Sequence, residues 1–157
     1  LNATSSEMYG HVRNKIDLKT QKKPLNPYGD AKKKSFNLVK KYRNLYQMSN
    51  YNAIMFNTDS YLRNKNFLIA KICIGAIKAF KNKKKITLNN ILVSREWNWC
   101  EEQSQLLFKF LSKKPQDFIL SNGKNYTIKQ MLNFAYQYFN LDFKKFVNVK
   151  FKKLKKK

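Results

Sequence analysis

The chain has 157 residues, enough for one domain with a buried core. Hydrophobic residues make up 43% and aromatic residues 15%, which excludes wholesale disorder, and no run of about 18 apolar residues predicts a transmembrane helix. Lys and Arg total 33 against 9 Asp and Glu, a formal net charge of +24. Such a charge attracts polyanions. The lysines are spread over the whole length, however, which favours biased composition over a dedicated nucleic-acid surface.

The number of cysteines and the N-terminal residues indicate in which cellular compartment we expect the protein. Two cysteines are too few for a disulfide framework or a metal site. Cys73 falls in an apolar helical pattern and Cys100 follows a tryptophan, so we expect both thiols to be buried and reduced. The polar N-terminal residues predict no signal peptide. We therefore expect a cytoplasmic protein with no membrane partner, in which the lone His11 is solvated.

In chain order, the first half alternates strands, loops and helices. The expected elements are the end of a strand at residues 1–5, a loop at 7–25, a helix from Pro27 to Met48, a buried strand at 51–57 and a loop at 58–66. Proline is tolerated in the first turn of a helix, which favours Pro27 as its beginning. Helical spacing assigns the core face of this helix to Ala31, Leu38, Val39, Tyr42, Leu45 and Tyr46.

The second half continues the alternation. The expected elements are a helix at residues 67–80, a basic turn at 82–85, a strand at 86–88, a helix at 101–113, a strand at 117–120, a helix beginning after Thr127 and a loosely alternating strand at 142–151. Thr127 and Gln130 have the spacing of a capping box, so this last helix is the best defined. Strands alternating with helices predict α/β architecture with parallel pairing. The strands are too few for a complete doubly wound sheet, so we expect the second half of one with a small helical part.

A tyrosine and a lysine lie four residues apart at the start of the first predicted helix. Tyr28 and Lys32 then share one helix face. An ammonium close to a phenol stabilises the phenolate and lowers the tyrosine pKa, so Tyr28 is a candidate for proton exchange. The pair is common by chance in a chain rich in lysine. A second stretch about twenty residues upstream, with Ser5, Ser6 and Glu7, makes it more specific.

Together these stretches resemble the active-site segments of extended short-chain dehydrogenases. Within that group, Ser6-Glu7 directly after Ser5 resembles the GDP-mannose 4,6-dehydratases. The resemblance extends in order through residues 54–57, 67–71, 95–97, 115–120 and 126–130. It implies a Rossmann-like fold and covers the chain to about Phe143.

The resemblance implies the chemistry of the site. Tyr28 would take the C4 hydroxyl proton of a sugar, Lys32 would favour its phenolate, Ser5 would hydrogen-bond the same oxygen, and Glu7 would be the acid and base at C5 and C6. The implied cofactor is NADP, contacted here by Tyr28 and Lys32. The implied substrate is GDP-mannose, and the residues implied to bind it are Ser6, Asn57, Leu68, Lys71 and Arg95. Lysine and arginine side chains bind diphosphates well, and the arginine guanidinium can donate two parallel hydrogen bonds to one phosphate.

The chain also departs from the family pattern. Its four glycines do not form the Gly-rich phosphate turn that opens a dinucleotide-binding half. Asn98 and Trp99 stand where the family keeps Gly-His. We therefore expect one partial domain over residues 1–157: a catalytic segment at 1–57, a substrate- and nucleotide-binding part at 58–143 and a basic tail at 144–157. A separate N-terminal half or a homo-oligomer would complete it.

Three alternatives remain open from the sequence. The chain could be an inactive remnant, another nucleotide-sugar epimerase or dehydratase, or a small basic nucleic-acid-binding protein. Glu7 argues against an epimerase. The nucleic-acid alternative is disfavoured because no recognised motif is present and the aromatic residues fall on predicted core faces.

Overall fold

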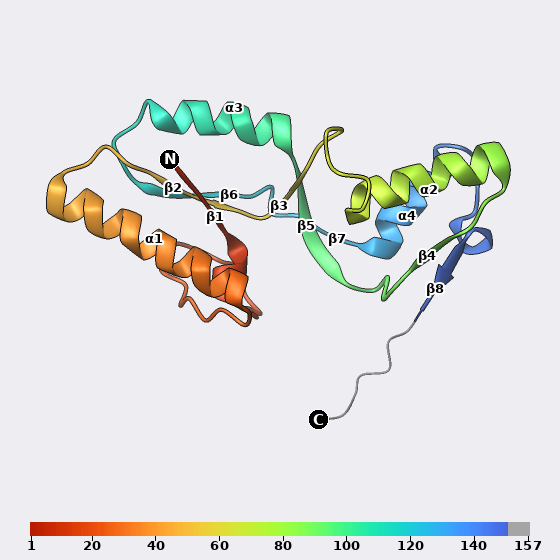
Figure 1. The fold of residues 1–157 in the computed structure, drawn as a ribbon, viewed down its shortest axis with the longest axis horizontal. Helices are drawn as coiled ribbons and strands as arrows, with labels where there is room; N and C mark the ends of the chain where they lie inside the picture. The colour runs from red at the N-terminus through yellow and green to blue at the C-terminus, as the bar shows by residue number, and fades with distance from the viewer. Residues whose placement is uncertain (151–157) are drawn as a thin grey trace, which may run out of the picture. The chain divides into compact units, whose positions relative to one another are not determined.

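The computed structural model describes residues 1–150 (Figure 1). Residues 151–157, which hold half of the predicted basic tail, lie outside the described part. The chain divides into two compact units that interleave in sequence. Unit 1 comprises residues 1–58 and 97–123, and unit 2 comprises residues 59–96 and those from 124 on. Within residues 1–150, no helix has the length and apolar character needed to cross a bilayer.

Unit 1 is built on a three-stranded parallel sheet in the order β1-β2-β6. Its elements are β1 (Asn2–Ser5), the 3₁₀ turn η1 (Ser6–Tyr9), α1 (Pro27–Tyr46), β2 (Asn52–Met55), α3 (Cys100–Leu111) and β6 (Asp117–Leu120). Two further strands are β3 (Asn57–Asp59) and β5 (Ser94–Trp99). Each contains a point in the sequence where one unit ends and the other begins. The predicted α/β class with parallel pairing is confirmed.

Helices cover both faces of this sheet, because successive side chains of a strand point to opposite sides. On one face, Ile54 and Ile119 pack with Phe36 of α1 and with Met8 and Tyr9 of η1. The opposite face packs against α3, and its cluster consists of Tyr51, Ala53, Met55, Phe118 and Leu120 with Leu107 and Phe110. Figure 1 shows α1 and α3 on either side of the strands. This is the doubly wound arrangement.

Helix α1 differs from the prediction in which residues it buries. It begins at Pro27 as expected, but only Gly29 and Phe36 are fully buried, while Leu38, Tyr42, Leu45 and Tyr46 are exposed. The assignment of these four to the core was wrong, and Ala31 is exposed as well. The reason is the face of the helix: with about 3.6 residues per turn, these side chains point away from the side that buries Gly29 and Phe36. Arg43 shares the buried side and pairs with Asp117 at the start of β6.

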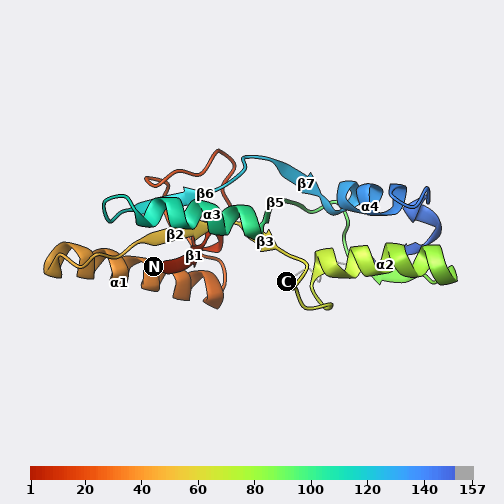
Figure 2. The ribbon, with the colours of Figure 1, turned by 90° about the horizontal axis from the view of Figure 1, so that it is seen from above.

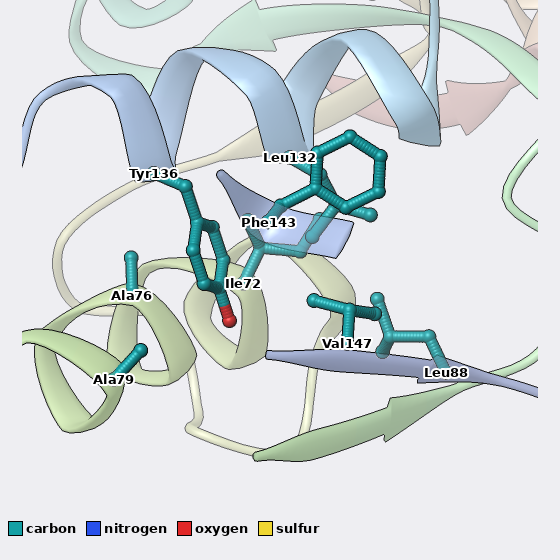
Figure 3. Packing of buried hydrophobic residues seen from close by; sticks show 8 residues of the cluster. All are labelled: Ile72, Ala76, Ala79, Leu88, Leu132, Tyr136, Phe143 and Val147. Atoms are coloured by element: carbon teal, nitrogen blue, oxygen red, sulfur yellow. The ribbon is translucent and has the colours of Figure 1, made fainter. Parts of the chain in front are cut away.

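Unit 2 has two helices that lie side by side (Figure 2). They pack against a two-stranded parallel sheet, with the core between the helices and the strands (Figure 3). Its elements are α2 (Leu68–Asn82), β4 (Ile86–Leu88), β7 (Asn125–Thr127), α4 (Ile128–Gln137), the 3₁₀ turn η2 (Phe143–Lys145) and β8 (Val147–Val149). The fully buried residues of this core are Ile72, Ala76, Ala79, Leu88, Leu132, Tyr136, Phe143 and Val147. The predicted capping box at Thr127 and Gln130 is confirmed, with reciprocal hydrogen bonds.

Other local predictions need correction. Both cysteines are free and exposed, so the expectation of buried thiols was wrong. The predicted last strand is shorter, because residues 143–145 form a 3₁₀ turn before β8. Strand β5 was not predicted at all. Its inward side chains include Glu96 and Asn98, both buried and polar, so its hydrophobic pattern carries no strand signal.

Candidate active site

Three predicted site residues lie where β1 ends. Ser5 is the last residue of β1, and Ser6 and Glu7 begin η1. The Oγ atom of Ser5 accepts a hydrogen bond from the backbone N–H of Glu7 at 3.2 Å, so Ser5 caps this turn. The serines are half-buried and Glu7 is exposed. In open α/β sheets, ligands bind beyond the carboxyl ends of the strands, which is the position of these side chains.

The amino end of α1 is joined directly to this turn. Asn26 caps α1 by accepting a hydrogen bond on Oδ1 from the Gly29 N–H at 2.7 Å. Its side-chain amide donates to Oε2 of Glu7 at 3.1 Å. One asparagine therefore positions the carboxylate of Glu7 relative to the first turn of α1.

Gly29 allows α1 to approach the turn closely. A Cβ atom at this position would lie 2.6 Å from the carbonyl oxygen of Glu7 and 3.1 Å from Cβ of Pro24. The first of these is backbone, which cannot rotate aside. Any side chain at residue 29 would thus push the amino end of α1 away from Glu7.

Tyr28 and Lys32 are brought together one turn apart on α1. The Nζ atom of Lys32 lies 5.6 Å from the centroid of the Tyr28 ring and donates a hydrogen bond to the carbonyl oxygen of Ala3 at 2.8 Å. The hydroxyl of Thr4 donates to the carbonyl oxygen of Lys32 at 3.2 Å. The lysine is therefore held to β1, while the Tyr28 side chain is 56% exposed. A phenol, an ammonium, a carboxylate and a serine hydroxyl form one constellation over β1, η1 and α1.

Three ionisable groups of the η1 turn and the loop after it have shifted pKa values, and among them only Tyr9 is buried. Burial, together with the charges of Asp17 and Asp117, raises the pKa of Tyr9 to about 12. The Tyr9 hydroxyl donates to the carbonyl oxygen of Asp17 at 3.2 Å. Hydrogen bonds from Thr20 hold the pKa of Asp17 below its usual range. Partial burial, together with nearby Lys40, lowers the pKa of Lys22, whose Nζ lies 4.5 Å from the centroid of the Phe36 ring.

The residues predicted to bind the nucleotide fall in both units. Leu68 and Lys71 of α2 line a hollow of about 310 Å³ in unit 2. The rest of its lining is mostly polar and consists of Asn66, Thr87, Leu88, Asn89, Asn90 and Ile128. Lys71 is exposed and also lines an adjoining hollow of about 380 Å³ with Lys65 and Lys78. These surfaces can accept an anion.

Arg95 and Asn57 lie elsewhere. Arg95 stands on β5 opposite Tyr126 of β7, and its guanidinium donates to the neighbouring carbonyl oxygen of Ser94 at 2.9 Å. It does not line the hollow of Leu68 and Lys71. Asn57 begins β3 in unit 1, and its carbonyl oxygen accepts a hydrogen bond from Asn98 at 3.4 Å. The structure thus brings Leu68 and Lys71 together, but not Arg95 with them.

Two residues of the site were not assigned a role from the sequence. Asn26 and Gly29 fix the joint between η1 and α1, although neither carries the chemistry. An asparagine directly before a Pro-initiated helix is a capping signal. Its bond to Glu7, nineteen residues away, has no such signal. Among residues 1–150, no cluster of His, Cys, Asp and Glu could hold a metal ion.

The sequence matches one protein family along its whole length. The family model described as GDP-mannose 4,6 dehydratase matches residues 1–157. The chain belongs to the GDP-mannose 4,6 dehydratase family. It is 30% identical to GDP-mannose 4,6 dehydratase 2 of Caenorhabditis elegans over 85% of this chain and 36% of that protein. It is 30% identical to GDP-mannose 4,6 dehydratase 1 of Arabidopsis thaliana over 94% of this chain and 41% of that protein.

The chain therefore spans about two fifths of the length of the curated family members that it matches. Solved structures agree on the fold. A dTDP-glucose 4,6-dehydratase of Bacillus anthracis, solved with NAD, has a TM-score of 0.85 at 17% identity over 96% of this chain and 49% of that chain. RMD of Pseudomonas aeruginosa, solved with NADPH, has a TM-score of 0.87 at 16% identity over 98% of this chain and 53% of that chain. These likenesses show the fold, and the Rossmann-like prediction is confirmed.

Proposed function

We propose that this chain contributes the catalytic residues of a cytoplasmic dehydratase that converts GDP-mannose to GDP-4-keto-6-deoxymannose with NADP. The observation that supports this most directly is the joint between Glu7 and α1. The close approach at Gly29 and the bond from Asn26 fix a carboxylate beside the turn that bears Tyr28 and Lys32. A dehydration needs both a proton acceptor at a hydroxyl and an acid–base group at neighbouring carbons, and this joint supplies both.

The proposed roles follow from the chemistry of each side chain. Tyr28 takes the proton of the C4 hydroxyl, and the ammonium of Lys32 favours the negative charge that develops on the phenol oxygen. Ser5 donates a hydrogen bond to the same sugar oxygen. Once C4 is a ketone, the proton on C5 becomes acidic, and Glu7 removes it. The protonated Glu7 then gives a proton to the departing C6 hydroxyl, so water leaves and the carboxylate is restored.

The residues present fit one end of a nicotinamide cofactor. The exposed phenol of Tyr28 and the ammonium of Lys32 offer donors that suit ribose hydroxyls. When bound, NADP would accept the C4 hydride and return it at C6. C5 then takes up one proton, which balances the proton that Tyr28 took from the C4 hydroxyl and releases. The Gly-rich turn that would cradle the cofactor phosphates has no counterpart among the four glycines of this chain. The titles of related structures name NAD and NADPH, which supports a nicotinamide cofactor of this kind.

The contacts of the nucleotide part of GDP-mannose are proposed from the residues that the family resemblance implies. Lys71 contributes a cation from the hollow that it lines with Leu68. Ser6, Asn57 and Arg95 are proposed as further contacts, Arg95 through its guanidinium fork. Because the chain lacks the cofactor-phosphate turn, its partner is proposed to be a separate N-terminal half, with a homo-oligomer as the other arrangement.

The proposal is tested by complementation. The full chain is co-expressed with the N-terminal half of a family member that carries the Gly-rich turn, and the pair is incubated with GDP-mannose and NADP. We expect mass spectrometry to detect a nucleotide sugar lighter by one water. Tyr28→Phe and Glu7→Gln are expected to reduce the rate by about a hundredfold or more. Tyr42→Phe, on an exposed part of the same helix, is the matched control and should leave the rate unchanged.

Two results would reject the assignment. If the complemented pair dehydrates no GDP-mannose although calorimetry shows GDP binding, the catalytic roles are wrong. If the chain binds neither GDP nor NADP in the presence of the added half, the substrate assignment fails as well. Salt-dependent binding to random DNA without GDP binding would favour the basic binding protein instead.

A further inference from the structure

The loop between β6 and β7 contains a pair of residues that the proposed function does not use. Asn122 precedes Gly123 in this loop, and both are exposed. Asparagine stands directly before a glycine nowhere else in the chain, since the other three glycines follow Tyr9, Tyr28 and Ile74. In such a pair, the backbone nitrogen of the glycine can attack the side-chain amide carbon of the asparagine and close a five-membered ring.

The surroundings of Gly123 leave room for this attack. Its φ is +71°, and apart from its chain neighbours no atom of residues 1–150 lies within 4 Å of the point where a Cβ would stand. Glycine also has no side chain to crowd its own nitrogen. The Gly123 N–H donates to the exposed Oγ atom of Ser121 at 3.1 Å, and residues 121–124 belong to no helix or strand. The attacking nitrogen is therefore reachable in the folded chain.

The side chain of Asn122 ties the loop to β5. Its Nδ2 atom donates a hydrogen bond to the carbonyl oxygen of Trp97 at 2.6 Å. A carboxylate in place of this amide has no N–H to donate, so its oxygen would face the carbonyl oxygen of Trp97. Two acceptors at that distance repel each other. Loss of the amide nitrogen would therefore change the contacts of β5 as well as the charge of the loop.

The charge of the chain favours the ring closure. The attack begins when the Gly123 N–H loses its proton to a base such as hydroxide. A net charge of +24 raises the concentration of small anions, hydroxide included, at the surface of the chain. Lys124 places a further positive charge one residue after the nitrogen that becomes negative. An opposite charge close by favours the charged form of a group.

We propose that Asn122 is a site of spontaneous deamidation in the folded chain. The backbone nitrogen of Gly123 forms a bond to Cγ of Asn122, and the bond from Cγ to Nδ2 breaks. Together with the proton that the Gly123 N–H gives up, Nδ2 leaves as ammonia, and a cyclic succinimide remains. Water then opens this ring at either carbonyl, which yields aspartate or, where the main chain runs through Cγ, isoaspartate. Either product carries one more negative charge and has no amide to donate to Trp97.

The test follows the mass of the full chain in a mildly alkaline buffer at body temperature. After digestion with trypsin, the peptide that ends at Lys124 is expected to gain one dalton and to elute in additional peaks. An isoaspartyl methyltransferase with labelled S-adenosylmethionine detects the isoaspartate independently. The internal control is the peptide that contains Asn89 and Asn90, which are also exposed. Its mass should change at least about tenfold more slowly, because the residue after each of these asparagines has a side chain that crowds its nitrogen.

Variants test the pair and the consequence of its modification. Asn122→Gln keeps an amide but would have to close a less favourable six-membered ring, so it should gain no mass on the same timescale. Asn122→Asp has the charge of the product and should speed hydrogen exchange of the β5 amides. Asn90→Asp adds the same charge in the loop before β5 and is the matched control, which should leave that exchange unchanged.

Three outcomes would overturn the proposal. If the peptide ending at Lys124 gains mass in guanidinium chloride but not in the folded chain, the folded loop prevents ring closure. If Asn89 or Asn90 changes as fast, the glycine after Asn122 has no special role. Unchanged exchange of β5 in Asn122→Asp would mean that the modification leaves the contacts of this strand intact. None of these measurements needs GDP or NADP, so their results are independent of the dehydratase assignment.

Discussion

The two ends of the β1-β2-β6 sheet use polar side chains in opposite ways. At the amino end, each strand begins with a polar residue: Asn2, Asn52 and Asp117. Asn2 donates to Asn52 at 2.8 Å, Asn52 donates to Asp117 at 2.9 Å, and Arg43 of α1 pairs with Asp117 at 2.6 Å. Asn52 is fully buried. These groups satisfy one another and leave little for a ligand.

At the carboxyl end, the polar groups face outward. Glu7 is exposed, Tyr28 is more than half exposed, and Ser5 and Lys32 are half-buried. Their positions depend on one capping asparagine and one close backbone approach instead of a closed network. The difference indicates that the amino end stabilises the sheet, whereas the carboxyl end positions reactive groups. Substitutions at the two ends should therefore separate stability from activity.

The largest effect on stability is expected from Asp117→Ala. It leaves the Arg43 guanidinium, whose side chain is only 14% exposed, without its carboxylate, and it removes an acceptor of buried Asn52. Breaking one side of a buried pair costs about 3 kcal/mol or more. Urea unfolding should report this loss in the free energy of unfolding. Asp30→Ala removes the exposed pair with Lys34 and should cost far less, because exposed ion pairs contribute little to stability. Equal losses of unfolding free energy in the two variants would contradict the claim that the Asp117 network stabilises the sheet more than a surface ion pair does.

An alkaline titration tests the buried phenol of Tyr9. The pKa of Tyr9 is raised from 10.0 to about 12 in the folded chain. A group with a raised folded pKa stabilises the protein below the unfolded pKa, and this contribution is lost as pH rises through the folded value. Stability should therefore fall between pH 10 and pH 12, by at most about 3 kcal/mol from this residue. Tyr9→Phe should flatten that part of the profile, and an unchanged profile would contradict the assignment.

Gly29→Ala should break the joint at the carboxyl end. The added Cβ meets the Glu7 carbonyl at 2.6 Å, so α1 must move. We expect a loss of about 1–2 kcal/mol in the free energy of unfolding, since overpacking outweighs the helix propensity gained with alanine. In the complemented enzyme the rate should fall further than the stability alone explains. Gly123→Asn, where no atom lies within 4 Å and asparagine tolerates the left-handed backbone, is the control.

The sequence predicted those parts of the fold whose signals are local. The bounds of β6 and the capping box of α4 follow from short patterns that the structure reproduces. The core face of α1 was predicted wrongly, because apolar residues occupy its exposed side, whereas its buried side carries Gly29, Phe36 and the paired Arg43. Strand β5 was missed because its inward side chains are polar. The return of residues 97–123 to unit 1 has no sequence signal at all.

The candidate site was predictable in a different way. Spacing alone brought together Tyr28 and Lys32, and the resemblance to the family added Ser5 and Glu7. Asn26 could be expected to cap α1, but not to bind Glu7, because that contact depends on how the loop at residues 10–25 folds back. The hydrogen bond of Lys32 to Ala3 is likewise a tertiary contact.

Substitutions of Asn26 should separate stability from activity most finely, because this side chain both caps α1 and hydrogen-bonds Glu7. Asn26→Ala removes both the cap on Gly29 and the bond to Glu7, and it should cost about 1 kcal/mol. Asn26→Ser keeps a capping oxygen but has no amide to reach Glu7, so it should recover most of the stability. If the amide positions the carboxylate, Asn26→Ser remains slow in the complemented enzyme although it unfolds like the wild type. A serine variant with full activity would mean that Glu7 needs no positioning from α1, and the joint would then serve stability alone.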